Sequence, residues 1–561
     1  MIAFTLDDEP VQVPDDGESL LYALREHLGK RCVKDGCSPQ GQCGCCTVWI
    51  DGLPRVSCVT PARRADGRAV TTTDGLSDDD RERWARAFVG AGASQCGFCT
   101  PGIVMRLAAL EGRREKRSGA NGPDGRPGAA TGAAGVTAER VRTALLAHLC
   151  RCTGWQTIVE AAADVLGIDQ EASSLVADPP RDPLMVQWRA QVEGPAFQLT
   201  RPETVLGTAI FADDMAPADA RVAVLGADGE LVVAGTLAEA RQHAHKVQGR
   251  NSGVPLVHPV PLPDGEWDLT LQTTWVEPAY LEPDASWCRP GSLPASPLAN
   301  GGAFGGKRRS PVPGEARRLA GELHAPVRVL WTREDVTRLG PKRPPIAAGV
   351  RRDGKGVLRF ARTGIGDASA LRDDELVLTR RVAAVSEHVD VEHADVLGPP
   401  VSAELRGVGW VEASVLLAGL RALVEGRTGP GWPAEVTAPS GGRARVTVHR
   451  DDAITVEVWA GTVLDDVTLR SYCIGAVHQA LGWVWQEGIA VDHDGQVCDL
   501  TIRSFGIVNA RDMPHIDVVI HPAATWPVNG SDAVFAATAA AVWVADGLVP
   551  HWPTRSGRTS T

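Results

Sequence analysis

The sequence lacks an apolar run long enough to cross a membrane. Its longest such run, residues 535–549, has 15 residues and already contains Asp546, whereas a spanning helix needs about 20. Positive charge is also in short supply: 57 basic against 69 acidic side chains give a net charge of -12. This balance argues against a protein held on nucleic acid by phosphate contacts. The first ten residues, MIAFTLDDEP, contain neither a basic segment nor an apolar one, so we expect no secretory signal and a cytoplasmic protein.

The chain has 561 residues, of which 43% are hydrophobic and 22% charged. These values predict a mostly globular protein of roughly three or four domains. Cysteine is unevenly distributed, because 10 of the 13 cysteines lie in the first 152 residues. Without an export signal, such a cluster predicts metal or redox chemistry before disulfides.

Residues 1–75 have the pattern of a small strand-rich domain with one helix. Apolar residues recur at helical spacing only between Ser19 and Leu28, and Asp51-Gly52 is a strong hairpin signal. The predicted strands are Ile2–Leu6, Val11–Val13, Thr47–Ile50 and Arg55–Val59.

Residues 76–167 have a helical pattern. The predicted helices are Asp78–Val89, Pro101–Glu111, Thr137–Leu149 and Thr157–Leu166. Between the second and third of these, residues 112–135 are rich in Gly, Ala, Arg and Pro, which predicts a flexible insertion. We expect an interdomain linker at 168–182, and an α+β region of at least two lobes over 183–561.

The first cysteine motif is C-S-P-Q-G-Q-C-G-C-C, residues 37–46, followed by Cys58. The plant-type [2Fe–2S] site uses C-x4-C-x2-C and a distant fourth cysteine, and here the first gap is one residue longer. The predicted ligands are therefore Cys37, Cys43, Cys46 and Cys58. Cys32 and Cys45 remain without a role, and Cys45 is expected to point away from the metal. A four-cysteine structural zinc site is the alternative.

The second motif joins Q-C-G-F-C-T-P-G, residues 95–102, to L-C-R-C-T-G-W, residues 149–155. Both lie at predicted helix ends, so their thiolates can converge on one four-cysteine site. The predicted ligands are Cys96, Cys99, Cys150 and Cys152. The alternatives are zinc and a thioredoxin-like redox pair, although no βαβ pattern surrounds the first pair.

Together these motifs resemble the xanthine dehydrogenase/aldehyde oxidase family of molybdenum hydroxylases. The resemblance covers residues 1–167 almost continuously. It implies a multidomain α+β protein with a β-grasp ferredoxin domain, a four-helix [2Fe–2S] domain and a molybdopterin-binding-like region. It also implies two [2Fe–2S] clusters, and that Gln95 and the loop around Cys150 face the pterin.

Residues 183–561 resemble the family's molybdopterin-binding region in separate segments. The clearest are N-G-G-A-F-G-G-K at 300–307, R-G-V-G-W-V-E at 406–412 and N-G-S-D at 529–532. Glycines such as those in the first segment let backbone amides approach a metal-bound group or a pterin. The resemblance implies that Gly302, Gly305 and Gly306 bind the cofactor and that Phe304 walls the substrate slot. It further implies that Arg406 positions the substrate, and that Asp532 is the catalytic base in place of the family's Glu.

Departures from the family pattern accompany these segments. Asp532 is one methylene shorter than Glu, and displacing a base by about 1 Å can lower a rate roughly a hundredfold. The region is about half the family's usual length, with no counterpart of its GQG-containing lobe between 425 and 445. No stretch resembles a flavin domain, so electrons would leave to a separate acceptor.

Two hypotheses follow. The first is an enzyme that hydroxylates an aldehyde or N-heterocycle at a molybdenum–pterin centre and passes electrons through two [2Fe–2S] clusters. The second is a non-catalytic electron-transfer or scaffold subunit, whose C-terminal region binds no molybdenum and which serves a partner catalytic chain. A flavin subunit or a larger molybdenum subunit is the partner that the resemblance implies. A zinc-stabilised interaction protein is the third, blander interpretation.

Overall fold

The computed structural model describes residues 1–118, 136–168, 181–194, 196, 200–209, 211–245, 247, 249–298, 301–364 and 368–557. Most of the expected insertion and linker, and Asn300 of the Gly-rich segment, lie outside these residues. The chain forms two compact units. Unit 1 comprises Met1–Arg181, Leu199–Ile210 and Asn509–Asp512, and unit 2 comprises Asp182–Gln198, Phe211–Val508 and Met513–Thr561.

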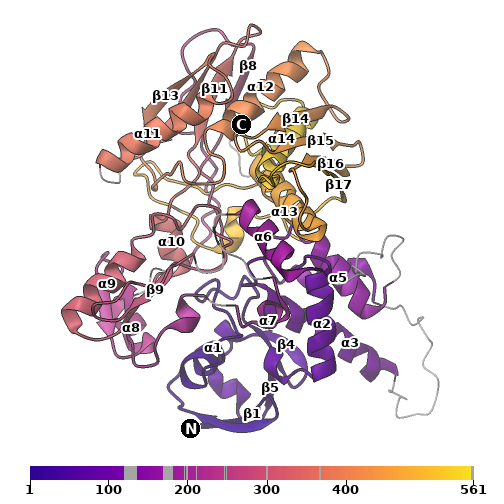
Figure 1. The fold of residues 1–561 in the computed structure, drawn as a ribbon. Helices are drawn as coiled ribbons and strands as arrows, with labels where there is room; N and C mark the ends of the chain where they lie inside the picture. Colours follow the sequence, from indigo (N-terminus) through magenta and orange to yellow (C-terminus); the bar gives the residue numbers. More distant parts are fainter. Residues whose placement is uncertain are drawn as a thin grey trace. The chain divides into compact units, whose positions relative to one another are not determined.

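Unit 1 begins with a five-stranded sheet in the order β2-β1-β5-β3-β4 (Figure 1). Two hairpins, β1–β2 and β3–β4, flank β5, which pairs parallel to β1 and antiparallel to β3. This is the predicted β-grasp arrangement. The strands are β1 (Ile2–Leu6), β2 (Glu9–Val13), β3 (Thr47–Ile50), β4 (Leu53–Val56) and β5 (Ala69–Thr71). A helical segment, α1 (Leu20–Tyr22) continued by a π-helix (Ala23–His27), packs its leucines into the core.

Four helices follow in the described residues between 76 and 168, where four were predicted. They are α2 (Asp78–Gly90), α3 (Thr100–Ser118), α4 (Ala138–Leu145) and α5 (Gln156–Leu166). The second continues seven residues beyond its predicted end, into the segment expected to be a flexible insertion. The third ends four residues early. A short helix from the returning chain, α7 (Pro202–Leu206), packs on α2 and α3.

The described residues of unit 2 form three four-stranded sheets, ordered β7-β6-β10-β9, β13-β12-β11-β8 and β14-β15-β16-β17. The strands of the first two are β6 (Arg221–Leu225), β7 (Leu231–Ala234), β8 (Leu269–Gln272), β9 (Ala285–Cys288), β10 (Val327–Leu330), β11 (Ile346–Val350), β12 (Gly356–Arg362) and β13 (Val389–Asp395). Those of the third are β14 (Pro433–Thr437), β15 (Arg443–Val448), β16 (Ile454–Trp459) and β17 (Ile516–His521). Each sheet mixes parallel and antiparallel pairs, as expected for an α+β region.

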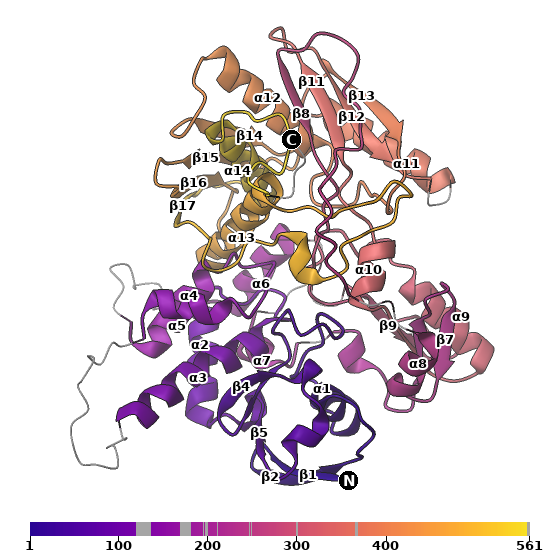
Figure 2. The same cartoon turned by 180° about the vertical axis from the view of Figure 1, so that it is seen from behind.

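The described residues of unit 2 also form helices (Figure 2). They are α6 (Pro183–Glu193), α8 (Leu237–Ala244), α9 (Val312–Leu323), α10 (Arg333–Leu339), α11 (Ala368–Ala383), α12 (Trp410–Val424), α13 (Asp466–Trp485) and α14 (Ser531–Ala545). Of these, α8 and α9 pack on the first sheet, α11 and α12 on the second and α13 on the third, whereas α6 packs on α13. The alanine-rich α14 packs on β14 and β15 and against α12 and α13. Its small residues allow this close packing, while Trp483, Trp543 and Trp552 fill the space beside it with stacked and edge-on rings. Of the helices in the described residues, none is both long and apolar enough to span a membrane.

Candidate functional site

The first cysteine set lies in unit 1, in the loop that precedes β3 and in the turn after β4. The Cys37 thiol contacts those of Cys43 and Cys58, and Cys58 also contacts Cys46. All four are at most 4% exposed. The backbone N–H of Gln40 donates to Cys37 Sγ at 3.2 Å, a contact of the kind that tunes the potential of an iron–sulfur cluster.

The second set joins the start of α3 to the loop between α4 and α5. Cys96 Sγ and Cys152 Sγ lie 3.6 Å apart, and the Cys99 and Cys150 thiols also contact each other. Contact with Cys99, assisted by the Thr153 hydroxyl and opposed by burial, lowers the pKa of Cys150 to about 6. The same contact raises the pKa of Cys99.

In the first set the thiol contacts run from Cys43 through Cys37 and Cys58 to Cys46, and in the second they join Cys96 to Cys152 and Cys99 to Cys150. A two-iron cluster takes two thiolates on each iron. The pKa values agree with this, because contact lowers the pKa of Cys37 and raises that of Cys43. Only added positive charge, such as that of a bound metal centre, would let both ionise.

The remaining residues of these motifs take other positions. Cys32 donates to Asp74 Oδ2 at 3.6 Å and lies apart from both sets. Cys45, expected to point away from the first set, contacts the Cys43 thiol instead. The buried amide of Gln95 donates from Nε2 to the Cys152 carbonyl at 3.0 Å, so it ties the two halves of the second motif together.

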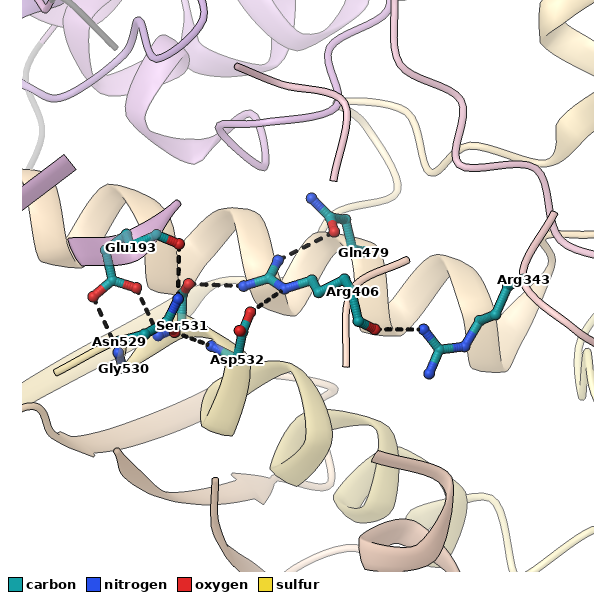
Figure 3. A network of polar contacts seen from close by, with 8 residues as sticks. All are labelled: Glu193, Arg343, Arg406, Gln479, Asn529, Gly530, Ser531 and Asp532. Carbon is teal, nitrogen blue, oxygen red and sulfur yellow. Dashed lines mark hydrogen bonds and ion pairs between the residues drawn. The ribbon is translucent and has the colours of Figure 1, made fainter. Parts of the chain in front are cut away.

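Unit 2 brings together two of the predicted catalytic residues (Figure 3). Arg406 Nε donates to Asp532 Oδ1 at 2.7 Å, although 126 residues separate the two. The remaining guanidinium nitrogens donate to Gln479 Oε1 at 3.1 Å and to Ser531 Oγ at 2.8 Å. The Arg406 side chain is 11% exposed and that of Asp532 is 32% exposed. The carboxylate is therefore the part of this polar cluster that reaches solvent most.

The backbone of Arg406 is held from two sides. Its N–H donates to the Phe304 carbonyl at 3.1 Å, and its own carbonyl accepts from Arg343 Nη1 at 2.8 Å. Arg343 is a buried cation that pairs with Glu412 at 2.5 Å and lies 4.1 Å from the Trp483 ring centroid. The Phe304 ring lies 5.9 Å from the Arg406 guanidinium. Phe304 therefore borders the polar cluster, as a slot wall would.

The Gly-rich segment packs against the chain itself. A Cβ on Gly305 would lie 2.0 Å from the Glu404 carbonyl oxygen, and one on Gly306 would lie 2.6 Å from the Tyr280 ring. Gly302 has a left-handed backbone with φ 79°. Close packing onto the segment before Arg406 thus requires glycine at 305, and packing against the Tyr280 ring requires it at 306, independently of any cofactor. The pair Arg308 Nη1–Glu404 Oε2, 2.8 Å, joins the same two segments.

Sequence reasoning missed four residues of the polar network. Ser531 lies inside the N-G-S-D segment, and Gln479 lies in G-A-V-H-Q-A-L-G, residues 475–482, which also resembles a family segment. Their position in these segments was the available signal. Arg343 and Glu193 lie in segments without a motif. Glu193 accepts from the N–H groups of Gly530 and Ser531 at 3.1 and 2.9 Å, a contact that no local pattern predicts.

Comparison with known proteins finds iron–sulfur relatives for residues 4–163. A 2Fe–2S iron–sulfur cluster binding domain matches residues 4–71, and a [2Fe–2S] binding domain matches residues 72–163. The xanthine dehydrogenase iron–sulfur-binding subunit of Escherichia coli O157:H7 is 35% identical over 164 residues, 29% of this chain and 92% of that protein. The chain belongs to the xanthine dehydrogenase/aldehyde oxidase family. This oxidoreductase family explains why both cysteine motifs occur in one chain.

Two further likenesses concern the iron–sulfur part and the fold of the chain. The nicotine 6-hydroxylase small subunit of Paenarthrobacter nicotinovorans is 38% identical over 153 residues, 27% of this chain and 81% of that protein. The aldehyde oxidoreductase from Desulfovibrio gigas aligns with all of this chain and 99% of its own, with a TM-score of 0.69 at 15% identity. The second likeness shows that the whole chain, including unit 2, has the fold of this family member.

Proposed function

We propose that this protein is a molybdenum hydroxylase-type oxidoreductase that hydroxylates an aldehyde or N-heterocycle and passes the electrons through two [2Fe–2S] clusters. The observation that carries the proposal is the contact between Arg406 and Asp532, which joins two family-like segments from distant parts of the chain. Electrons would leave to a separate acceptor, either a flavin subunit or another partner chain. We also propose a cytoplasmic protein, with domains at 1–75, 76–167 and 183–561.

In this proposal a molybdenum–pterin group would supply, when bound, Lewis-acid activation of oxygen and a two-electron acceptor. Asp532 would take a proton at its carboxylate, which reaches solvent and is held at one oxygen by Arg406 Nε. Arg406 would orient a substrate oxygen or nitrogen with its guanidinium, and Phe304 would border the substrate. Cys37, Cys43, Cys46 and Cys58 would hold one cluster, and Cys96, Cys99, Cys150 and Cys152 the other.

One observation favours the second function, a non-catalytic electron-transfer or scaffold subunit. Gly305 and Gly306, expected to approach the pterin, are packed against Glu404 and Tyr280 of the same chain. Asp532 is also engaged in an internal ion pair. In this alternative the polar cluster holds the fold of unit 2 together, and a larger molybdenum subunit performs the chemistry.

Metal analysis of the purified chain separates the two functions. The enzyme predicts about four iron atoms per chain together with stoichiometric molybdenum and pterin. Iron at that level without molybdenum supports the subunit, and iron-free, zinc-loaded protein contradicts both.

Substitution of Asp532 tests the catalytic proposal directly. Asp532→Ala removes the proton acceptor and should lower kcat by about 10² to 10⁴, the usual contribution of a general base. Asp532→Glu restores the family's longer carboxylate and should keep or raise activity. Asp466→Ala is the matched control, because Asp466 is an exposed carboxylate in the first turn of the neighbouring α13. Unchanged turnover in Asp532→Ala removes this residue from the mechanism.

A further inference from the structure

The start of α14 is held by a carboxylate from a distant part of the chain. Glu193, the last residue of α6, accepts from Gly530 N with Oε1 and from Ser531 N with Oε2. Its own carbonyl accepts from Asn529 Nδ2 at 2.8 Å. The backbone N–H groups of Gly530 and Ser531 have no partner within α14, because they lie at its start. The positive end of the helix dipole also favours a negative charge there.

Glu193 is itself fixed by a buried cation. Arg189 lies one turn earlier on α6, and both side chains are 0% exposed. Its guanidinium pairs with Glu193 and also donates from Nη2 to the Val528 carbonyl at 2.6 Å. Arg189 Nε and Nη1 are buried without a hydrogen-bond partner. Loss of the carboxylate would thus leave a buried positive charge beside two orphaned N–H groups, which is costly.

The residues that Glu193 holds at the start of α14 are in contact with Arg406. Ser531 accepts from Arg406 Nη2 through its Oγ, and its backbone N–H donates to Glu193. Asp532 accepts from Arg406 Nε, and its N–H donates to Asn529 Oδ1 at 2.9 Å. Figure 3 shows the continuous chain of contacts from Glu193 through Asn529, Gly530 and Ser531 to Arg406.

We propose that Glu193 is a positioning residue, which sets the place of Asp532 and Arg406 by capping α14. The pair Arg189–Glu193 acts through the backbone of residues 528–531 and does not touch the proposed reaction site. An effect of Glu193 on turnover rests on the proposed function. The capping of α14 by Glu193, and the placing of Arg406 that follows from it, do not rest on that function.

The test uses the purified full chain with its iron–sulfur clusters. Phenylglyoxal labels accessible arginines, and peptide mass spectrometry gives the labelling rate of Arg406. Glu193→Ala should raise that rate several-fold, because Ser531 and Asp532 no longer hold the guanidinium in place. Acetate has the size of the group deleted from Glu193. Adding it should therefore restore slow labelling of Arg406 in this variant and raise the temperature at which the variant unfolds. Acetate should change neither quantity in the parent chain.

Glu322→Ala is the matched control. Arg318 and Glu322 form the same i,i+4 pair on α9, but with side chains 49% and 55% exposed. This variant should label Arg406 at the parent rate and show no acetate effect. If Glu193→Ala does not fold, Glu193→Gln carries the test, since it keeps the volume and one acceptor oxygen but loses the charge.

Unchanged Arg406 labelling in a folded Glu193 variant would overturn the proposal, as would faster labelling that acetate leaves unaffected. Because labelling needs no molybdenum, this outcome is separate from failure of the proposed function. If the chain does turn over substrate, Glu193→Ala should lower kcat more than it changes KM, and acetate should recover kcat.

Discussion

The cysteine sets of unit 1 and the polar cluster of unit 2 are assembled in different ways. In unit 1, three thiols of the first set lie within residues 37–46, the second set consists of two close pairs at residues 96–99 and 150–152, and relatives match that part of the chain at 35–38% identity. In unit 2, contacts converge on Arg406 from residues as far away as Asp532, and the match to a solved relative is 15%. Metal coordination restricts which residue types can serve and how they are spaced in the sequence. A hydrogen-bonded cluster restricts only the positions in space of a few polar groups, which can come from any part of the chain.

The largest effect is expected from removing one thiol of the second set. Cys96→Ala deletes the partner that lies 3.6 Å from Cys152, so one cluster should be lost and iron should fall from about four to about two atoms per chain. Cys288→Ala, at a buried thiol on β9, should leave iron unchanged. Iron assay and electron paramagnetic resonance of the reduced protein measure the outcome. Full iron content in Cys96→Ala would contradict the proposed ligand set.

The second-largest effect is expected on the stability of unit 2, from breaking a buried ion pair. Lys342 and Glu277 lie 2.9 Å apart with both side chains 0% exposed, and burial lowers the pKa of Lys342. Glu277→Gln leaves a buried cation without its counter-ion, so the free energy of unfolding should fall by about 3–5 kcal/mol. Denaturant unfolding measures it, with the exposed Glu322→Gln as control at about 0.5 kcal/mol or less. A loss as small as the control's would show that solvent reaches Lys342.

Local patterns predicted those parts of the fold whose causes are local. The range of β3 was predicted without error, and that of α2 to within one residue, because the Asp51-Gly52 turn follows β3 and a Ser77 cap precedes α2. Strand β5 was missed, since it has three residues and owes its place to pairing with β1 and β3. The predicted strand at residues 55–59 stops at Val56, where a 3₁₀ turn begins and brings Cys58 to its thiol partners.

The same distinction applies to the sites. Cysteine spacing predicted two thiol sets, because a metal ligand must be a particular side chain. Spacing could not show that Gly305 is required by the Glu404 carbonyl, about 100 residues further along the chain. Nor could it show that a carboxylate on α6 caps a helix near the other end of the chain. Such contacts depend on tertiary packing, which residue patterns do not encode over that separation.

A second buried ion pair of unit 2, Glu282 with Lys307, should make the free energy of unfolding depend on pH. Burial raises the pKa of Glu282 to about 7, although Lys307 opposes this with a contact of 2.6 Å. Between about pH 4.5 and pH 7 the unfolded chain releases this proton while the folded chain keeps it. The contribution of Glu282 to stability should therefore fall over that window by at most about 3 kcal/mol, and stay constant above it. Glu282→Gln lacks this dependence, so the difference in unfolding free energy between parent and variant, measured from pH 4 to pH 8, should follow that curve. A flat difference would contradict the raised pKa.

The smallest effect concerns two helix caps, one in each unit. Ser77 accepts from Asp80 N at 3.2 Å on the exposed start of α2, whereas Thr332 forms a buried capping box with Asp335 at the start of α10. Ser77→Ala should lower the free energy of unfolding by about 1 kcal/mol, the usual value for a lost cap. Thr332→Ala should lower it by about 2 kcal/mol, because the Asp335 carboxylate also loses the Thr332 hydroxyl at 2.6 Å and water does not replace it readily. Equal losses in the two variants would mean that burial does not strengthen the cap in unit 2. The sensitivity of that unit to single polar groups would then be confined to its ion pairs, and the polar contacts around Arg406 would be expected to tolerate neutral substitutions.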